Sequence, residues 1–176
     1  MRNVMIDIET LGTKATSVVL SIGAVEFEFG KNELGQEFHR RVSIDSCLDH
    51  GLTLDGRTLE WWMDQSDEAK DVFRRPGDPL NEVLLDFQTA FDFEGEVWCN
   101  GAAFDVPILE NAFHATKRVP PWKFWNVRDY RTVRNLVSRD TFKQLEVLPR
   151  IAHDALEDAK AQTLTLLAMM DHIRHG

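Results

Sequence analysis

The sequence has few of the features that mark a secreted or membrane-spanning protein. Its two cysteines, Cys47 and Cys99, lack the spacing of metal ligands, and we expect them to be reduced thiols. No apolar run approaches the ~20 residues that a membrane-spanning helix needs. Asp7 and Glu9 interrupt the N-terminal stretch before the apolar region of a signal peptide can form. We therefore expect a cytoplasmic protein that does not associate with membranes.

Positive charge is also scarce, because 20 Lys and Arg residues stand against 29 Asp and Glu residues and give a formal net charge of −9. This balance argues against a broad basic surface for duplex nucleic acid. The charge is uneven, however, since residues 44–96 carry 14 acidic and 4 basic residues, whereas residues 117–143 carry 8 basic and 2 acidic residues. A local basic patch suits a short, single-stranded anionic ligand, although a solvated helix face explains any single arginine equally well.

What the chain does have is enough apolar material for one core. It is 176 residues long, with 43% hydrophobic and 28% charged residues, which is typical of a globular domain. No repeat, linker or low-complexity segment divides it. We therefore expect a single domain over residues 1–176.

The hydrophobic pattern predicts three closely spaced strands, followed by helices that alternate with two more strands. The strands are expected at about 3–9, 17–29, 36–44, 97–99 and 124–127. Helices are expected from a cap at Thr58 through 63, continuing or restarting over 66–74, from a cap at Asp78 through 79–92, and at 105–115, 129–138 and 155–173. Short connections imply antiparallel hairpins, whereas helical crossovers imply parallel strands. The predicted fold is α/β, a mixed five-stranded sheet flanked by helices.

Two acidic residues interrupt the first strand. Side chains on a strand alternate between its faces, so Asp7 and Glu9 point to the same side. Neighbouring carboxylates repel each other and lose hydration on burial, and a divalent cation between them relieves both penalties. An ordinary solvated strand face is the simpler alternative for this pattern taken alone.

Acidic residues also occur at the ends of two later elements. Asp105 follows the strand at 97–99 across a short Gly-Ala-Ala turn. Near the C-terminus, Asp154 and Glu157 have the spacing of a capping box, which predicts a helix start. This places His153 in the loop before the helix and Asp158 in its first turns. We expect His153 and Asp158 to face one pocket.

These residues together resemble the DEDDh branch of the 3′–5′ exonuclease superfamily, which has a ribonuclease H-like fold. The D-x-E motif of the family matches Asp7 and Glu9, its second motif matches Asn100 to Asp105, and H-x-x-x-x-D matches His153 and Asp158. Order and spacing agree over essentially the whole chain. The Thr-Leu-Glu-Trp-Trp segment makes it most similar to the phage-type exodeoxyribonuclease and mycobacterial exoribonuclease-like subgroup.

The resemblance implies a metal-dependent enzyme that hydrolyses single-stranded DNA or RNA from its 3′ end and releases nucleoside 5′-monophosphates. Carboxylates are hard oxygen ligands that suit two Mg²⁺ (or Mn²⁺) ions, and a pair of ions stabilises both the attacking and the leaving oxygen. The implied ligands are Asp7, Glu9, Asp105 and Asp158, with Asp7 bridging both ions. His153 is implied as general base, because histidine titrates near pH ~6.5.

Substrate contacts are expected on either side of the acidic site. The resemblance places Thr10 and Leu11 against the terminal nucleotide, through backbone groups and an apolar wedge. Trp61 and Trp62 point about 100° apart on a helix, so one can lie in the core while the other stacks on a base. We favour Trp61 for stacking, and we expect Phe104 under the site or against the sugar.

Other predictions concern the basic segment. Arg128, Arg131 and Arg134 have the spacing of one helix face and are candidates for phosphate or subunit contacts. Trp122 and Trp125 flank a predicted strand, so we expect both in the core. The resemblance also implies a homodimer.

Three alternatives stay open. The same site can act mainly on RNA or on very short oligonucleotides. A catalytically silent ribonuclease H-like module would bind nucleic acid or a protein without needing the five motif residues. A cation-dependent hydrolase of small phosphoesters would show no 3′-end polarity.

Overall fold

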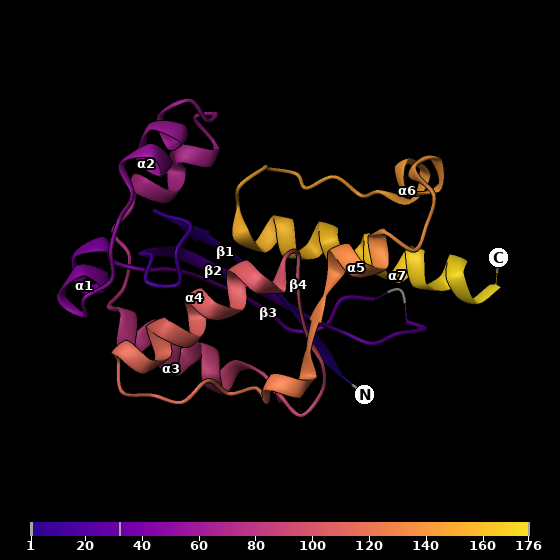
Figure 1. Cartoon of the computed structure of the whole chain (residues 1–176), viewed down its shortest axis with the longest axis horizontal. Coiled ribbons are helices and arrows are strands. Elements are labelled where there is room, and N and C mark those ends of the chain that lie inside the picture. The colour runs from indigo at the N-terminus through magenta and orange to yellow at the C-terminus, as the bar shows by residue number, and fades with distance from the viewer. Residues whose placement is uncertain (1, 32, 176) are drawn as a thin grey trace.

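The computed structural model describes residues 2–31 and 33–175, and its central feature is a sheet with helices on both faces (Figure 1). The five strands are β1 (Asn3–Thr10), β2 (Val19–Phe27), β3 (Glu37–Arg41), β4 (Val97–Cys99) and β5 (Val127–Asp129). The α-helices are α1 (Ile44–Asp49), α2 (Gly56–Met63), α3 (Leu80–Ala90), α4 (Ala102–Ala115), α5 (Tyr130–Arg134), α6 (Arg139–Leu145) and α7 (Ala155–His175). Two 3₁₀ helices, η1 (Ala69–Phe73) and η2 (Phe124–Asn126), complete the described elements.

The sheet has the strand order β3-β2-β1-β4-β5. Strands β1, β2 and β3 pair antiparallel through short connections, whereas β4 pairs in parallel with the other edge of β1, and β5 pairs in parallel with β4. Parallel pairing needs a crossover, and α4 supplies the one between β4 and β5. The predicted mixed five-stranded α/β sheet is therefore confirmed, and β1 lies at its centre.

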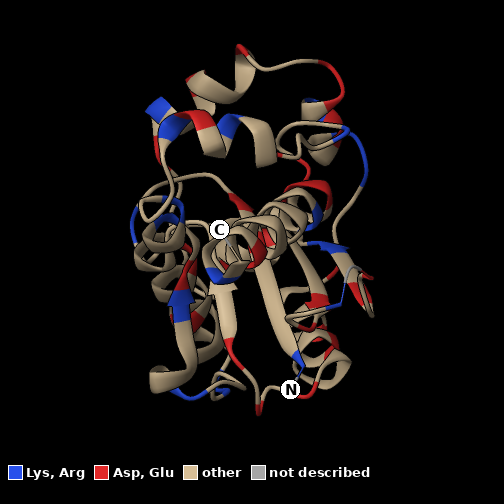
Figure 2. Ribbon diagram, turned by 90° about the vertical axis from the view of Figure 1, so that its right-hand side faces the viewer, with Lys and Arg blue, Asp and Glu red and all other residues tan. Residues whose placement is uncertain are grey.

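Alternation along β1 separates two apolar cores. Ile6 and Ile8 belong to the core on the face that α3 and α4 cover, whereas Met5 belongs to the core on the α7 face. Helix α7 lies along this second face, and Figure 2 shows it end-on over the strands. Asp7 and Glu9 share the face of Met5, so the fold directs both carboxylates towards α7.

Some predicted element boundaries are wrong. The fifth strand is Val127–Asp129, and Phe124–Asn126 forms a 3₁₀ turn before it. The single helix expected at 129–138 ends at Arg134, and Ser138 caps a separate helix, α6. Helix α1 was not predicted, because its six residues are too few to show a clear helical period.

Two predicted helix caps are also wrong. Asp55 rather than Thr58 caps α2, where its carboxylate accepts hydrogen bonds from the backbone N–H groups of Arg57 and Thr58. Asp78 does not cap α3, because its carboxylate pairs with the guanidinium of Arg40. At α2, two residues able to cap a helix lie three positions apart. At α3, the carboxylate of Asp78 has two possible partners, the helix N-terminus and Arg40.

The described residues mix both signs of charge and contain no candidate membrane span. Figure 2 shows acidic and basic residues distributed over many elements rather than a single basic face. No described helix is long and apolar enough to cross a bilayer. Cys47 and Cys99 are both buried and unpaired, as expected of free thiols.

Candidate active site

Close packing of α7 against the sheet brings the first two acidic residues into a shared site. In the β1–β2 register Asp7 lies opposite Gly23, and a Cβ atom at Gly23 would fall 2.1 Å from the carbonyl carbon of Ala155. Only a glycine allows the first turn of α7 to approach β2 so closely. The amide of Gln162 on α7 donates a 2.9 Å hydrogen bond to Asp7 Oδ1.

The third carboxylate comes from the start of α4. Strand β4 pairs in parallel with β1, and Gly101 then turns the chain with a φ of 106°. The backbone N–H of Ala102 donates to Asp129 Oδ2 at 2.8 Å, which fixes this turn. Asp105 in the first turn of α4 is only 3% exposed. It lies close enough to the end of β1 for the backbone of Ile8 to lower the pKa of its carboxyl, against the larger effect of burial.

His153 and Asp158 come from the start of α7, as predicted. Asp154 caps the helix by accepting hydrogen bonds from the backbone N–H groups of Leu156 and Glu157. His153 just before it has a φ of 64°, a left-handed conformation that is costly for a non-glycine residue. Its backbone N–H donates to Asp158 Oδ2 at 2.9 Å and holds the strained loop in place.

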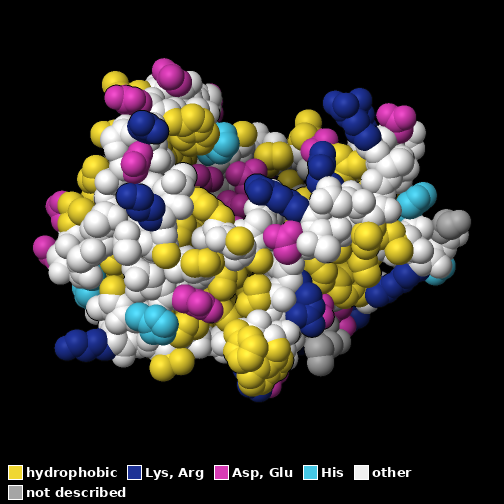
Figure 3. Space-filling view, viewed as in Figure 1, with side chains coloured by type: hydrophobic (Ala, Val, Ile, Leu, Met, Phe, Trp, Pro, Cys, Tyr) yellow, Lys and Arg dark blue, Asp and Glu magenta, His cyan; other side chains and the backbone are white. Residues whose placement is uncertain are grey.

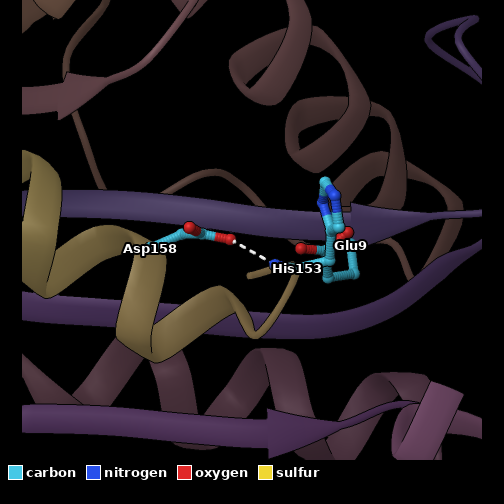
Figure 4. Close-up of side chains that lie close together, drawn as sticks. All are labelled: Glu9, His153 and Asp158. Carbon is cyan, nitrogen blue, oxygen red and sulfur yellow. Dashed lines mark hydrogen bonds between the residues drawn. The ribbon is translucent and has the colours of Figure 1, made fainter. Parts of the chain in front are cut away.

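Donor atoms of these segments converge on one small volume. One ligand atom each from Glu9, His153 and Asp158 lies within 4.8 Å of the other two. Figure 4 shows the three side chains approaching from β1, from the loop before α7 and from α7 itself. Figure 3 shows acidic side chains on the floor of a hollow between the lobe that carries α2 and the lobe that carries α6.

Ionisation of the carboxyl groups at this site is unfavourable, and their pKa values are raised. Burial, with repulsion from Asp158 and Asp105, raises the pKa of Glu9 to about 8. Burial raises the pKa of Asp105 to about 7, against hydrogen bonds from backbone groups and the charge of Arg131. Burial and the neighbouring carboxylates raise the pKa of Asp7 as well, and burial raises that of Asp158.

The donor set fits a divalent cation. Four carboxylates with raised pKa values share a site whose described surroundings offer few compensating positive charges, and cations bound there would relieve their repulsion. Oxygen ligands of this kind match Mg²⁺ or Mn²⁺, and a neighbouring imidazole is compatible with Mn²⁺ or Zn²⁺. The structure therefore contains a candidate metal site at Glu9, His153 and Asp158, and the roles of Asp7 and Asp105 as ligands stay a prediction.

A cavity of about 490 Å³ opens beside Glu9, and we call it the Trp61 cavity. It is lined by Ile8, Glu9, Thr10, Gly12, Thr13, Asp55, Arg57, Thr58, Trp61, Trp62 and Phe104. The ring of Trp61 is 44% exposed and packs edge-on against His153, with 4.9 Å between ring centroids. Phe104 is half-buried at the cavity wall. Three predicted substrate contacts, Thr10, Trp61 and Phe104, therefore share this cavity.

The neighbouring tryptophan and leucine have a different environment. Trp62 is 2% exposed, and its indole Nε1 donates to the backbone carbonyl of Thr10 at 2.9 Å. This bond fixes the end of β1 against α2. Leu11 is 3% exposed and packs in the core, and it does not line the Trp61 cavity. A contact between the Leu11 side chain and substrate remains a prediction, and it would require movement of the β1 end.

Three residues of the site were not predicted from the sequence. Gln162 follows Asp158 by four residues, so it lies on the same helix face and could have been found from that spacing. Asp55 and Arg57 line the Trp61 cavity from α2 and its cap, a proximity that no local pattern reveals.

The basic segment also differs from the prediction. Arg128 lies on β5 rather than on a helix, and its guanidinium bonds Glu96 and two backbone carbonyls. Arg131 and Arg134 share α5 as expected. Trp122 is buried, but Trp125 is 57% exposed, so the expectation of a core position is wrong for Trp125.

Comparison with known protein families identifies the family of this chain. The model of the Rv2179c-like 3′–5′ exoribonuclease domain matches residues 2–170. The chain belongs to this family. It is thus a 3′–5′ exonuclease domain, as the three acidic motifs had indicated. The exodeoxyribonuclease of Enterobacteria phage T4 is 25% identical to it over an alignment of 201 positions, and the match covers 94% of this chain and 88% of the phage protein.

Solved structures confirm the fold of this exonuclease domain. Exonuclease I superposes with a TM-score of 0.70 at 14% identity, covering 98% of this chain and 43% of the other. E. coli exonuclease I in complex with a 5cy-dT13 oligonucleotide gives 0.66 at 13% identity, covering 98% and 41%. Cell-death related nuclease 4 gives 0.63 at 14% identity, covering 98% and 64%. The chain thus spans less than half the length of the exonuclease I chains.

Proposed function

We propose that this domain is a divalent-metal-dependent exonuclease that removes nucleoside 5′-monophosphates from the 3′ end of single-stranded nucleic acid. The observation that carries the proposal is the cluster of donor atoms from Glu9, His153 and Asp158, with Asp7 and Asp105 close enough for all four carboxylates to repel one another. A module that only binds nucleic acid gains nothing from gathering four mutually repelling carboxylates, two of them buried. The strained backbone at His153 supports the same reading, because such strain concentrates at functional sites.

Each residue then has a distinct part in the reaction. Asp7, Glu9, Asp105 and Asp158 would hold two Mg²⁺ or Mn²⁺ ions. Ions held there would supply positive charge beside the phosphate that is hydrolysed. His153, at the mouth of the site, would take the proton from the attacking water. Asp158 also holds the backbone of His153, so it keeps the base in position.

The Trp61 cavity fits the nucleotide that is removed. Its volume of about 490 Å³ lies within the usual range of ~300–1,000 Å³ for small-ligand sites. The exposed face of Trp61 offers a base-stacking surface, with Phe104 near the sugar and Thr10 at the wall. Stacking tolerates any base, which suits an enzyme that shortens a strand one nucleotide at a time.

The sugar of the substrate is the open choice within this proposal. The family is named for an exoribonuclease, whereas the phage T4 relative is an exodeoxyribonuclease. Two of the E. coli exonuclease I structures hold DNA oligonucleotides, 5cy-dT13 and dA16. We therefore propose single-stranded DNA and RNA as candidate substrates, distinguished by comparing rates on the two.

A time course on denaturing gels tests the function. The substrates are 5′-labelled single-stranded DNA and RNA of the same sequence, with Mg²⁺, Mn²⁺ or EDTA. We expect a ladder that shortens from the 3′ end and that EDTA abolishes. Asp158→Asn should abolish it, whereas Asp171→Asn should not, because Asp171 is an exposed carboxylate on the same helix. Absence of a ladder with the folded wild-type protein and metal would favour a silent binding module.

Further parts of the proposal rest on the composition of the chain and, for the dimer, on the resemblance. We propose a single exonuclease domain over residues 1–176, a homodimer in solution and a cytoplasmic location. Sedimentation equilibrium of the purified protein tests the dimer, and a monomer at micromolar concentration would contradict it.

A further inference from the structure

A second cavity lies on the far side of the carboxylates from the Trp61 cavity. It has a volume of about 420 Å³, and we call it the Arg131 cavity. Its walls come from the turn before α4, from α5, from the segment before α7 and from α7 itself, and they include Asn100, Arg131, Arg134, Leu148, Asp158 and Gln162. Glu9 lines the Trp61 cavity and Asp158 lines this one, and their oxygens lie within 4.8 Å of each other. The two cavities therefore meet at the candidate metal site.

Two guanidinium groups are held in place at this cavity with most of their donors free. Arg131 Nε donates to Asn100 Oδ1 at 3.1 Å, and the guanidinium lies over Gly101, where an added Cβ atom would be 3.4 Å from it. The guanidinium of Arg134 lies 4.3 Å from the ring centroid of Phe142. Within residues 2–31 and 33–175, neither group forms an ion pair, and no further hydrogen bond engages their terminal nitrogens.

This arrangement differs from that of other arginines on the same protein. The guanidinium of Arg128 donates hydrogen bonds to Glu96 and to two backbone carbonyls, and that of Arg40 forms ion pairs with two aspartates. Arginines that are positioned by neutral partners beside a cavity, rather than neutralised by carboxylates, present an intact charge to a ligand. A guanidinium fork matches the oxygens of a phosphate group.

We propose that the Arg131 cavity is an upstream subsite, which takes the nucleotide on the 5′ side of the bond that is cut, with Arg131 and Arg134 binding the next phosphate of the strand. This inference rests on the proposed function. When the 3′-terminal nucleotide occupies the Trp61 cavity and its phosphate reaches the carboxylates, the rest of the strand leaves on the opposite side. The Arg131 cavity is the hollow that borders the carboxylates there. The upstream base would lie against the exposed side chain of Leu148.

Figure 3 shows dark-blue basic side chains beside the acidic floor, on the side towards α6. A strand crossing the hollow would therefore pass from acidic ligands to a basic wall. On a protein with a net charge of −9, such a local patch can hold one or two phosphates without attracting long duplexes.

The test compares substrates that differ only upstream of the bond that is cut. The first is a trinucleotide, and the second is the same trinucleotide with a neutral methylphosphonate at the linkage before the scissile one. The third is a nucleoside 5′-(p-nitrophenyl) phosphate, which keeps the terminal nucleotide and replaces the upstream one by nitrophenol. We expect Arg131→Ala to lower kcat/KM about tenfold on the normal trinucleotide, because the variant loses a charge-assisted hydrogen bond to the upstream phosphate. The same variant should change the rate on the other two less than about twofold.

Matched variants separate this role from a general loss of charge or of structure. Arg134→Ala should behave like Arg131→Ala, whereas Arg139→Ala removes the same charge from an exposed residue outside the cavity and should behave like wild type. Arg131→Lys keeps the charge and should recover part of the loss. Unchanged melting temperatures confirm folding.

Equal rates for wild type and both variants on the normal trinucleotide would overturn the subsite. So would an equal loss on the nitrophenyl ester, because Arg131 would then act on the carboxylate site through Asp105 rather than on the strand. Wild-type protein that cleaves neither the trinucleotide nor the ester would instead contradict the proposed function itself.

Discussion

The close approach of α7 to the sheet can be tested by replacing Gly23 with alanine. Gly23 lies opposite Asp7, and a Cβ atom there would fall 2.1 Å from the carbonyl carbon of Ala155 and 2.2 Å from the backbone nitrogen of Leu156. Non-bonded carbon atoms rest at ~3.5 Å or more, so the first turn of α7 would have to retreat by roughly 1.4 Å. Both neighbouring atoms belong to the backbone, which cannot rotate away as a side chain can.

That retreat would separate the two halves of the site. His153 and Asp158 move with α7, while Asp7 and Glu9 stay on β1. A misplacement of ~1 Å at reacting groups can lower the rate ~100-fold. Overpacking of this kind also destabilises a protein by ~1–3 kcal/mol. We therefore expect Gly23→Ala to lower kcat by about two orders of magnitude, and to lower the free energy of unfolding by ~1–3 kcal/mol.

The assay follows nitrophenol release at saturating metal, with urea unfolding measured on the same preparations. Gly56→Ala is the matched control, because nothing lies within 4 Å of a Cβ atom at Gly56 in the first turn of α2. In a helix alanine is favoured over glycine by up to ~1 kcal/mol, so this variant should be as stable as wild type or slightly more stable. Wild-type kcat and stability in Gly23→Ala would refute the argument that this packing sets the site geometry.

Three further predictions address the site residues. Gln162→Leu removes the hydrogen bond to Asp7 and should weaken Mn²⁺ activation ~10-fold or more in a folded protein; unchanged metal dependence would show that the bond is dispensable. The pKa of Glu9 is raised to about 8 and that of Asp105 to about 7, so the folded protein binds more protons than the unfolded chain above pH ~4. The free energy of unfolding of the metal-free protein should thus fall as the pH rises from about 4 to about 8, and adding Mn²⁺ should restore most stability near pH 8. A melting temperature that rises over this pH range would contradict the raised pKa values of these two carboxyls. Trp61→Ala should raise KM about tenfold through lost stacking, Trp61→Phe should retain most of the affinity, and equal KM values would exclude stacking.

The element types were predictable where a local pattern was strong. Alternating and continuous apolar residues placed β1 and β4 correctly, and the long helical period and the Asp154 cap placed α7. The predictions failed where local signals competed. Asp78 is a good cap by sequence, but its charge pairs with Arg40 instead. The segment at 129–138 contains two helix starts, Asp129 and Ser138, of which only the first was recognised.

The sequence by itself determined the chemistry of the site, because strand alternation puts Asp7 and Glu9 on one face and a cap beside His153 puts Asp158 in the first turns of a helix. Only the tertiary structure decided which side chains share a cavity. Trp61 and Trp62 are adjacent in the chain, yet one faces the cavity and the other bonds Thr10 in the core. Contacts of this kind join residues some fifty positions or more apart. They depend on how closely α2 and α7 pack against the sheet, which no local pattern of residues encodes.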